Sequence, residues 1–126
     1  MKQNMVNWFE IPVTDMDRAK KFYDIVFDIE ISVHDMNELV MWWFPFAEGK
    51  PGATGSLVKH KDFYCPSEKD GTLIYFSSED VQIQLDKVEP AGGKILQPKK
   101  QISEGHGYMA LFLDSEGNRI ALHSQR

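Results

Sequence analysis

Cysteine is almost absent from this chain, and positive charge is in deficit. The single thiol, Cys65, excludes an intrachain disulfide framework and a zinc site built from several cysteines. It also suits a reducing, cytoplasmic compartment, which is where we expect the protein. With 14 Lys and Arg against 19 Asp and Glu, the formal net charge is −5. That balance counts against nucleic-acid and anionic-membrane partners, because both require a basic face.

Long apolar runs are missing as well. No stretch of about 20 apolar residues occurs, so no segment is expected to cross a membrane. We also expect no secretory leader, because the residues after Met1 lead directly into a strand-like segment. What is present is ordinary globular composition: 126 residues, of which 42% are hydrophobic and 26% charged. Length and composition together predict one compact domain with a hydrophobic core of its own.

The first half of the chain has the pattern of a strand, a helix and three further strands. Apolar side chains alternate along Val6–Val13, which predicts a strand. Thr14 or Asp15 then offers a helix N-cap. Apolar residues three and four positions apart from Met16 to Phe27 predict an amphipathic helix. Further strands are predicted at residues 29–33, 38–46 and 54–60, with a turn at 34–37.

The same order of elements returns in the second half. A strand is predicted at residues 73–77, and Asp80 offers the next N-cap. A short helix with apolar positions from Val81 to Val88 follows and ends at the glycine pair 92–93. Strands are then predicted at 94–97, 107–113 and 119–123, with a solvated loop at 98–100 and a tight turn at 114–118.

The two halves keep a constant offset. Asp15 and Asp80 are 65 positions apart, and so are Asp28 and Gly93 at the two helix ends. This period predicts an α+β domain made of two βαβββ modules, approximately residues 1–60 and 71–126, joined by a linker at 61–70. Each module is expected to pack around a centre that both share.

Three segments resemble the vicinal oxygen chelate superfamily, which includes glyoxalase I, extradiol dioxygenases and bleomycin-resistance proteins. Residues 9–23 resemble its opening strand and helix, residues 80–93 its second helix, and residues 107–122 its closing hairpin. The three occur in the family's order and spacing, and the resemblance covers nearly the whole chain. It implies paired modules that form a curved, mostly antiparallel sheet around a cavity, commonly in a homodimer.

The resemblance also implies where a metal would be bound. In the enzymes of this superfamily, His, Glu or Gln side chains on four strands hold a divalent ion that acts as a Lewis acid. Three of these positions fall on Trp8, Leu73 and Ala121, and the fourth lies around Ser56 or Leu57. None of these side chains is a usual ligand for such an ion. We therefore predict no metal at the family position, with a displaced metal on Glu10 and His123 as an alternative.

Strand alternation predicts which side chains line the cavity instead. Side chains two apart along a strand share one face of a sheet, and the apolar residues between them are expected under the helices. His106 and Tyr108 are expected at the cavity mouth. A mostly apolar pocket with a few polar groups is typical of small-molecule sites. The predicted substrate-binding residues are Trp8, Glu10, Leu73, Tyr75, His106, Tyr108, Ala121 and His123.

These residues favour a binding protein for a small organic molecule, of the glyoxalase and bleomycin-resistance type. Trp8 and Tyr75 would supply stacking surface, while Glu10 and His123 would fix a polar group. One alternative is a lyase, isomerase or dioxygenase that uses a shifted metal or a catalytic Glu10/His123 acid–base pair within hydrogen-bond reach. Another is a non-catalytic dimeric interaction or sequestration module, with the exposed half of the aromatic segment 42–46 as its interface.

Overall fold

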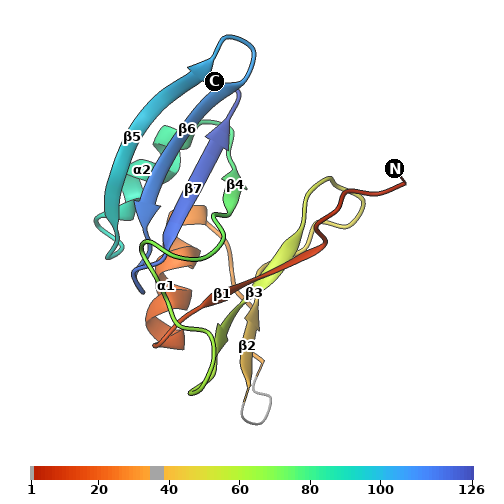
Figure 1. Ribbon diagram of the computed structural model, residues 1–126, viewed down its shortest axis with the longest axis vertical. Coiled ribbons are helices and arrows are strands. Elements are labelled where there is room, and N and C mark those ends of the chain that lie inside the picture. Colours follow the sequence, from red (N-terminus) through yellow and green to blue (C-terminus); the bar gives the residue numbers. More distant parts are fainter. Residues whose placement is uncertain (1, 35–38) are drawn as a thin grey trace.

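Two sheets and two helices make up the computed structural model, which describes residues 2–34 and 39–126 (Figure 1). The first sheet has the order β1 (Trp8–Pro12), β3 (Thr54–Lys59), β2 (Val40–Trp43), and the second has the order β4 (Tyr75–Ser77), β7 (Arg119–Ser124), β6 (Gly107–Leu113), β5 (Lys94–Ser103). The helices are α1 (Met16–Phe27) and α2 (Val81–Val88). Within the described residues, neither has the length and apolar character needed to cross a bilayer.

Both sheets repeat one topology. In each, the first strand pairs in parallel with the last strand, which pairs antiparallel with the strand before it. The predicted α+β fold is therefore confirmed. The second module completes its sheet with β5, whereas the strand predicted at 29–33 is reduced to a single antiparallel bridge between Ser32 and Trp43. Residues 35–37 of the predicted turn, and Glu38 at the start of the next predicted strand, lie outside the described residues.

The helix α1 has the bounds that its apolar spacing predicts. Asp15 caps it with a side chain that accepts a hydrogen bond from a backbone N–H of the first turn, and Asp28 ends it with a left-handed backbone at φ 53°. Asp80 caps α2 in the same way. The matched pair of caps is thus confirmed, but the left-handed residue after α2 is Gly92 (φ 105°) and not Gly93.

The strand β5 is longer than predicted, and the loop predicted at 98–100 is wrong. It is an edge strand paired only with β6, and its register shifts between Gln97 and Lys100. An edge with such irregularities tolerates Pro98, which has no N–H to donate. Lys99 is engaged as well: its Nζ lies 2.9 Å from Asp80 Oδ1 and 4.7 Å from the centre of the Tyr108 ring.

An aromatic core joins the two modules. Phe76 of β4 lies 5.6 Å from Phe9 of β1 and 4.7 Å from Phe27 of α1, measured between ring centres. Tyr23 lies edge-on to Phe44 at 5.3 Å. The predicted alternation is confirmed, because the apolar strand residues that face this core include Phe9, Ile11, Val13, Ile74, Phe76, Ile120 and Leu122.

A buried polar network also connects the modules. The Tyr23 hydroxyl donates to Asp114 Oδ2 over 2.6 Å, and both residues are buried. The Asn118 side-chain amide donates to the same Asp114 oxygen and to the backbone carbonyl of Pro12, at 3.1 and 2.7 Å. Burial raises the pKa of Asp114, although its hydrogen bonds act in the opposite direction. Burial also raises the pKa of Tyr23 well above its ordinary value.

Glu116, in the turn between β6 and β7, meets the start of α1. Its Oε1 accepts hydrogen bonds from the backbone N–H groups of Thr14 and Asp15 at 2.9 and 2.8 Å. Its Oε2 accepts one from Arg18 Nε at 2.6 Å. A carboxylate at this end of a helix is favoured by the unpaired N–H groups and by the helix dipole. The turn of the second module therefore anchors the helix of the first.

Removing the Tyr23 hydroxyl tests the hydrogen bond between Tyr23 and Asp114 that connects the two modules. In Tyr23→Phe the ring stays in the core, but the buried Asp114 carboxylate loses a donor, so the free energy of unfolding should fall by about 1–3 kcal/mol. Urea denaturation followed by circular dichroism measures the change. Tyr75→Phe, at a half-exposed ring, is the matched control and should change by less than about 0.5 kcal/mol. Equal effects of the two variants on the free energy of unfolding would contradict a stabilising role of the Tyr23–Asp114 hydrogen bond.

The Glu116 carboxylate should make stability depend on pH. Burial alone would raise its pKa, but hydrogen bonds from Arg18, Asp15 and Thr14 outweigh it and lower the pKa from 4.5 to about 2. Because the folded pKa is the lower one, this stabilisation is complete above pH 4.5 and is lost as the pH falls through about 2. Glu116→Gln should cost about 1–3 kcal/mol at neutral pH. In urea titrations the cost should shrink towards acid pH, and a pH-independent cost would refute the assignment.

Candidate functional site

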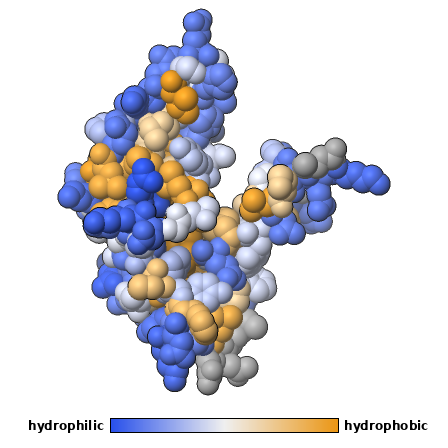
Figure 2. Space-filling view, viewed as in Figure 1, coloured by the Kyte–Doolittle hydropathy of each residue, from blue (hydrophilic) through white to orange (hydrophobic). Residues whose placement is uncertain are grey.

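A groove separates β1 and β4, the outer strands of the two sheets. It has a volume of about 620 Å³, within the range of small-molecule sites. Figure 2 shows the surface notched between the second sheet and the projecting arm that leads into β1. The groove is lined by Val6, Trp8, Phe9, Glu10, Pro51, Gly52, Ala53 and residues 72–77.

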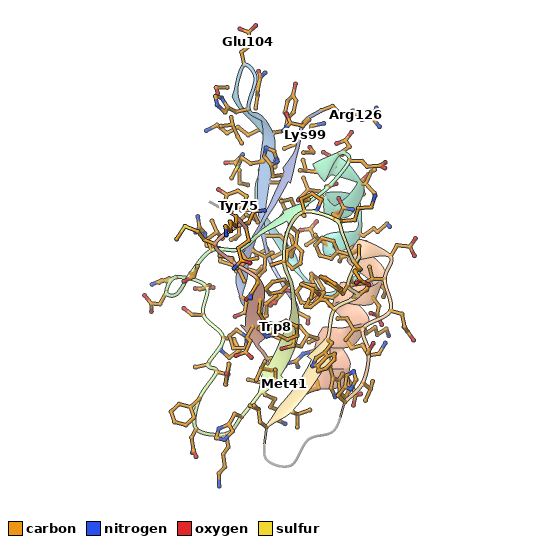
Figure 3. All side chains as sticks on the ribbon, turned by 90° about the vertical axis from the view of Figure 1, so that its right-hand side faces the viewer. Trp8, Met41, Tyr75, Lys99, Glu104 and Arg126 are labelled. Carbon is orange, nitrogen blue, oxygen red and sulfur yellow. The ribbon has the colours of Figure 1, made fainter. Side chains whose placement is uncertain are left out.

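Four predicted site residues come together in this groove: Trp8, Glu10, Leu73 and Tyr75. The Trp8 side chain is held at a right angle to Trp43 of β2, with 6.0 Å between ring centres and 87° between ring planes. Trp8 is 38% and Tyr75 52% exposed, and Figure 3 labels both. Two large aromatic surfaces are therefore open to a ligand.

Glu10 supplies the charge of the groove. Its Oε1 accepts a hydrogen bond from the Tyr64 hydroxyl at 2.6 Å, and its Oε2 lies 3.4 Å from Trp8 Nε1. No ion pair joins Glu10 to a basic side chain in the described chain, whose ion pairs involve other acids. The hydrogen bond to Glu10 raises the pKa of the Tyr64 hydroxyl. The Glu10 carboxylate is thus oriented by neutral donors and forms no ion pair among the described residues, and Arg119 lines a neighbouring pocket with it.

Tyr64 is the site residue that the sequence did not indicate. It lies in the predicted linker, and its backbone is left-handed, with φ 62°. For a bulky residue this conformation typically costs about 1–3 kcal/mol and is found where the surroundings require it. The bond to Glu10 spans 54 positions of sequence. Neither feature leaves a local pattern, so no spacing or periodicity could have revealed it.

Two predicted site residues of β7 lie outside the groove. Ala121 is paired with Tyr75 but is fully buried. His123 lies two positions further along and shares the sheet face that is turned away from α2. Its Nε2 lies 2.8 Å from the carbonyl oxygen of His106. Among the described residues, the Glu10 carboxylate accepts hydrogen bonds from Tyr64 and Trp8, and the His123 ring is hydrogen-bonded to His106. No hydrogen bond joins Glu10 to His123 there, so their acid–base pairing stays a prediction.

His106 and Tyr108, both expected at the cavity mouth, lie in two different places. His106 lies beside His123, and its Nδ1 is 2.7 Å from the Ser103 hydroxyl. Tyr108 lies instead on the helix-covered face of the second sheet, packed against the core under Lys99. The structure therefore corrects the expected location of Tyr108. The shift follows from the period of a strand, because residues 107–113 alternate between the two faces.

The family metal position does not fit a divalent ion in this chain. Its residues are Trp8, Leu73 and Ala121, together with Ser56, which pairs with Glu10 across β1 and β3. The Ser56 hydroxyl is fully buried and has no hydrogen-bond partner among the described residues. An indole, two hydrocarbon side chains and one hydroxyl lack the donors that such ions require. Nor do any three His, Cys, Asp or Glu side chains in residues 2–34 and 39–126 gather as a metal site.

Comparison with known proteins gives relatives that are similar in sequence. CFP32 of Mycobacterium tuberculosis and Mycobacterium bovis, provisionally named a glyoxylase, is 26% identical over 134 residues. The match covers 96% of this chain but 46% of CFP32, so the chain spans about half the length of the curated relatives it matches.

Two solved structures share the fold over nearly their full length. A glyoxylase/bleomycin resistance protein/dioxygenase domain from Frankia sp. EAN1pec superposes with a TM-score of 0.75 at 16% identity, covering 99% of this chain and 100% of that one. TnmS3, an antibiotic binding protein from Streptomyces sp. CB03234, has a TM-score of 0.68 at 20% identity, with 100% and 99% covered.

A family model also matches the chain. The model of the Glyoxalase/Bleomycin resistance protein/Dioxygenase superfamily matches residues 5–122, from just before β1 into β7. That span covers most of both modules and includes the four groove residues that were predicted from the sequence. On these grounds the chain belongs to the Glyoxalase/Bleomycin resistance protein/Dioxygenase superfamily.

Proposed function

We propose that this chain is a binding protein for a small organic molecule, held in the groove between β1 and β4 without a metal at the family position. The observation that carries the proposal is the groove itself. It has a volume of about 620 Å³, and its lining contains two exposed aromatic side chains, Trp8 and Tyr75, and a single carboxylate, Glu10. The likeness in fold to TnmS3, an antibiotic binding protein, supports it.

Each part of the groove has a different contribution to binding. Trp8 and Tyr75 offer apolar faces on which a ring or hydrocarbon can lie. Leu73 adds apolar lining, and Glu10 orients a polar group. A ligand that extends past Tyr75 would reach the neighbouring strand β7, where His123 lies opposite Ser77. His123 is therefore proposed as the second polar contact. Figure 2 shows apolar surface over the second sheet, which contains β7.

Binding by the two aromatic residues can be tested with naphthylmethanol, naphthylmethylamine and naphthylacetate. At least one of these probes should bind, as measured by isothermal titration calorimetry. Trp8→Ala and Tyr75→Ala should each weaken that binding about tenfold, because each removes an aromatic contact of roughly 1–1.5 kcal/mol. Phe63→Ala, which removes an exposed ring outside the groove, is the matched control and should leave affinity unchanged. The proposal fails if no probe binds, or if both groove variants bind like wild type.

We also propose that the protein is a cytosolic homodimer. In the aromatic segment 42–46, which begins at the end of β2, Trp42 and Phe44 are buried in the core, whereas Trp43 is 41% and Phe46 64% exposed. Exposed aromatic rings of this kind suit a contact between two copies of the chain. The free, exposed thiol of Cys65 is typical of a reducing compartment.

Light scattering tests the dimer directly. The mass should correspond to two chains of 14.5 kDa. Phe46→Ser should shift the mass towards one chain, because it removes apolar area from the proposed contact. Phe63→Ser, at a comparably exposed ring on a different loop, is the control and should stay dimeric. A wild-type monomer at high protein concentration would rule the dimer out.

A further inference from the structure

The charge of the groove between β1 and β4 has one sign. Glu10 is the single charged side chain among the residues that line it, and no described Lys, Arg or His lies with it in the lining. Each carboxylate oxygen has room for more than one hydrogen bond. Tyr64 and Trp8 donate one each, and the Trp8 contact is long at 3.4 Å. The carboxylate therefore keeps both its charge and part of its acceptor capacity for a group in the groove.

The aromatic walls favour the same kind of partner. The face of an aromatic ring carries negative electrostatic potential, so it attracts a cation, and tryptophan does so most strongly. Trp8 and Glu10 are two positions apart on β1, so both side chains project from one face of the sheet. Tyr75 exposes its ring from the facing strand. A carboxylate beside two exposed rings is an environment that lowers the energy of a positive charge.

We propose that the ligand of this groove is an organic cation: an apolar body that carries a protonated amine or a quaternary ammonium group. The body lies on Trp8 and Tyr75, and the cationic group lies against Glu10. This assignment rests on the proposed function of the groove and adds the chemical class of the ligand. An anionic ligand would meet repulsion from Glu10 and from the net charge of −5.

Tyr64 is the positioning residue for this charge. It reaches Glu10 from a strained left-handed backbone, and its hydroxyl holds Oε1 at 2.6 Å. The second carboxylate oxygen, Oε2, lies 3.4 Å from Trp8 Nε1. Tyr64→Phe keeps the ring but releases the carboxylate, so it should reduce the preference for a cation and leave the binding of a neutral probe in place.

The experiment compares naphthylmethylamine, which is protonated at neutral pH, with its neutral partner naphthylmethanol. Calorimetry at low ionic strength should give an affinity for the amine about tenfold higher than for the alcohol, from the ion pair and the ring contacts together. The preference should fall as salt is added, because screening weakens charge interactions at this partly exposed site. Glu10→Gln should bring the ratio close to one and keep the affinity for the alcohol, which also reports that the variant is folded.

Glu104→Gln is the matched control, because it removes one negative charge at the tip of the β5–β6 turn, far from Trp8 (Figure 3). Its ratio should equal that of wild type. If amine and alcohol bind equally well, or if Glu10→Gln keeps the preference, the cation assignment is overturned while the groove remains a binding site. If none of the naphthyl probes binds, the proposed function falls with it. If amine binding disappears at concentrations where the chain dimerises, a second copy occupies the groove and the assignment is overturned.

Discussion

The buried carboxylate of Asp114 is the point on which the relative position of the two modules depends. It accepts hydrogen bonds from Tyr23 of α1 and from Asn118, whose amide also binds the carbonyl of Pro12 at the end of β1. A buried carboxylate that loses its donors is costly, so the surrounding groups must stay where the donors can reach it. Because Pro12 ends the strand that carries Trp8 and Glu10, this network also sets one wall of the groove.

Local periodicity predicted much of the fold and half of the site. The apolar spacing from Met16 to Phe27 and the cap at Asp15 defined α1 to the residue, because both signals are contained within the helix itself. Alternation along three strands separated core side chains from open-face side chains. The family resemblance implied that Trp8 and Leu73 face the cavity, and alternation added Glu10 and Tyr75. The structure brings these four residues to one groove from segments more than sixty positions apart.

The features that the sequence could not predict depend on contacts between distant segments. Tyr64 lies in a stretch read as a linker, and only the folded chain brings its hydroxyl to Glu10. The strand β5 continues past Pro98 because it forms an edge, and edge status is a property of the whole sheet. Asp114 and Glu116 were read as a turn, which is correct locally, but their bonds to α1 cross about a hundred positions.

This chain belongs to the superfamily, but its site lacks the usual metal ligands of the superfamily's enzymes. The fold is that of the superfamily, but an indole and two hydrocarbon side chains stand at three metal positions, so function follows from the groove's own residues. Nuclear magnetic resonance of the Trp8 indole N–H, assigned through Trp8→Phe, tests this most directly. Titration with naphthylmethylamine should shift the Trp8 signal and leave that of Trp42, buried in the core, in place. An unchanged Trp8 signal at saturating probe would contradict the account.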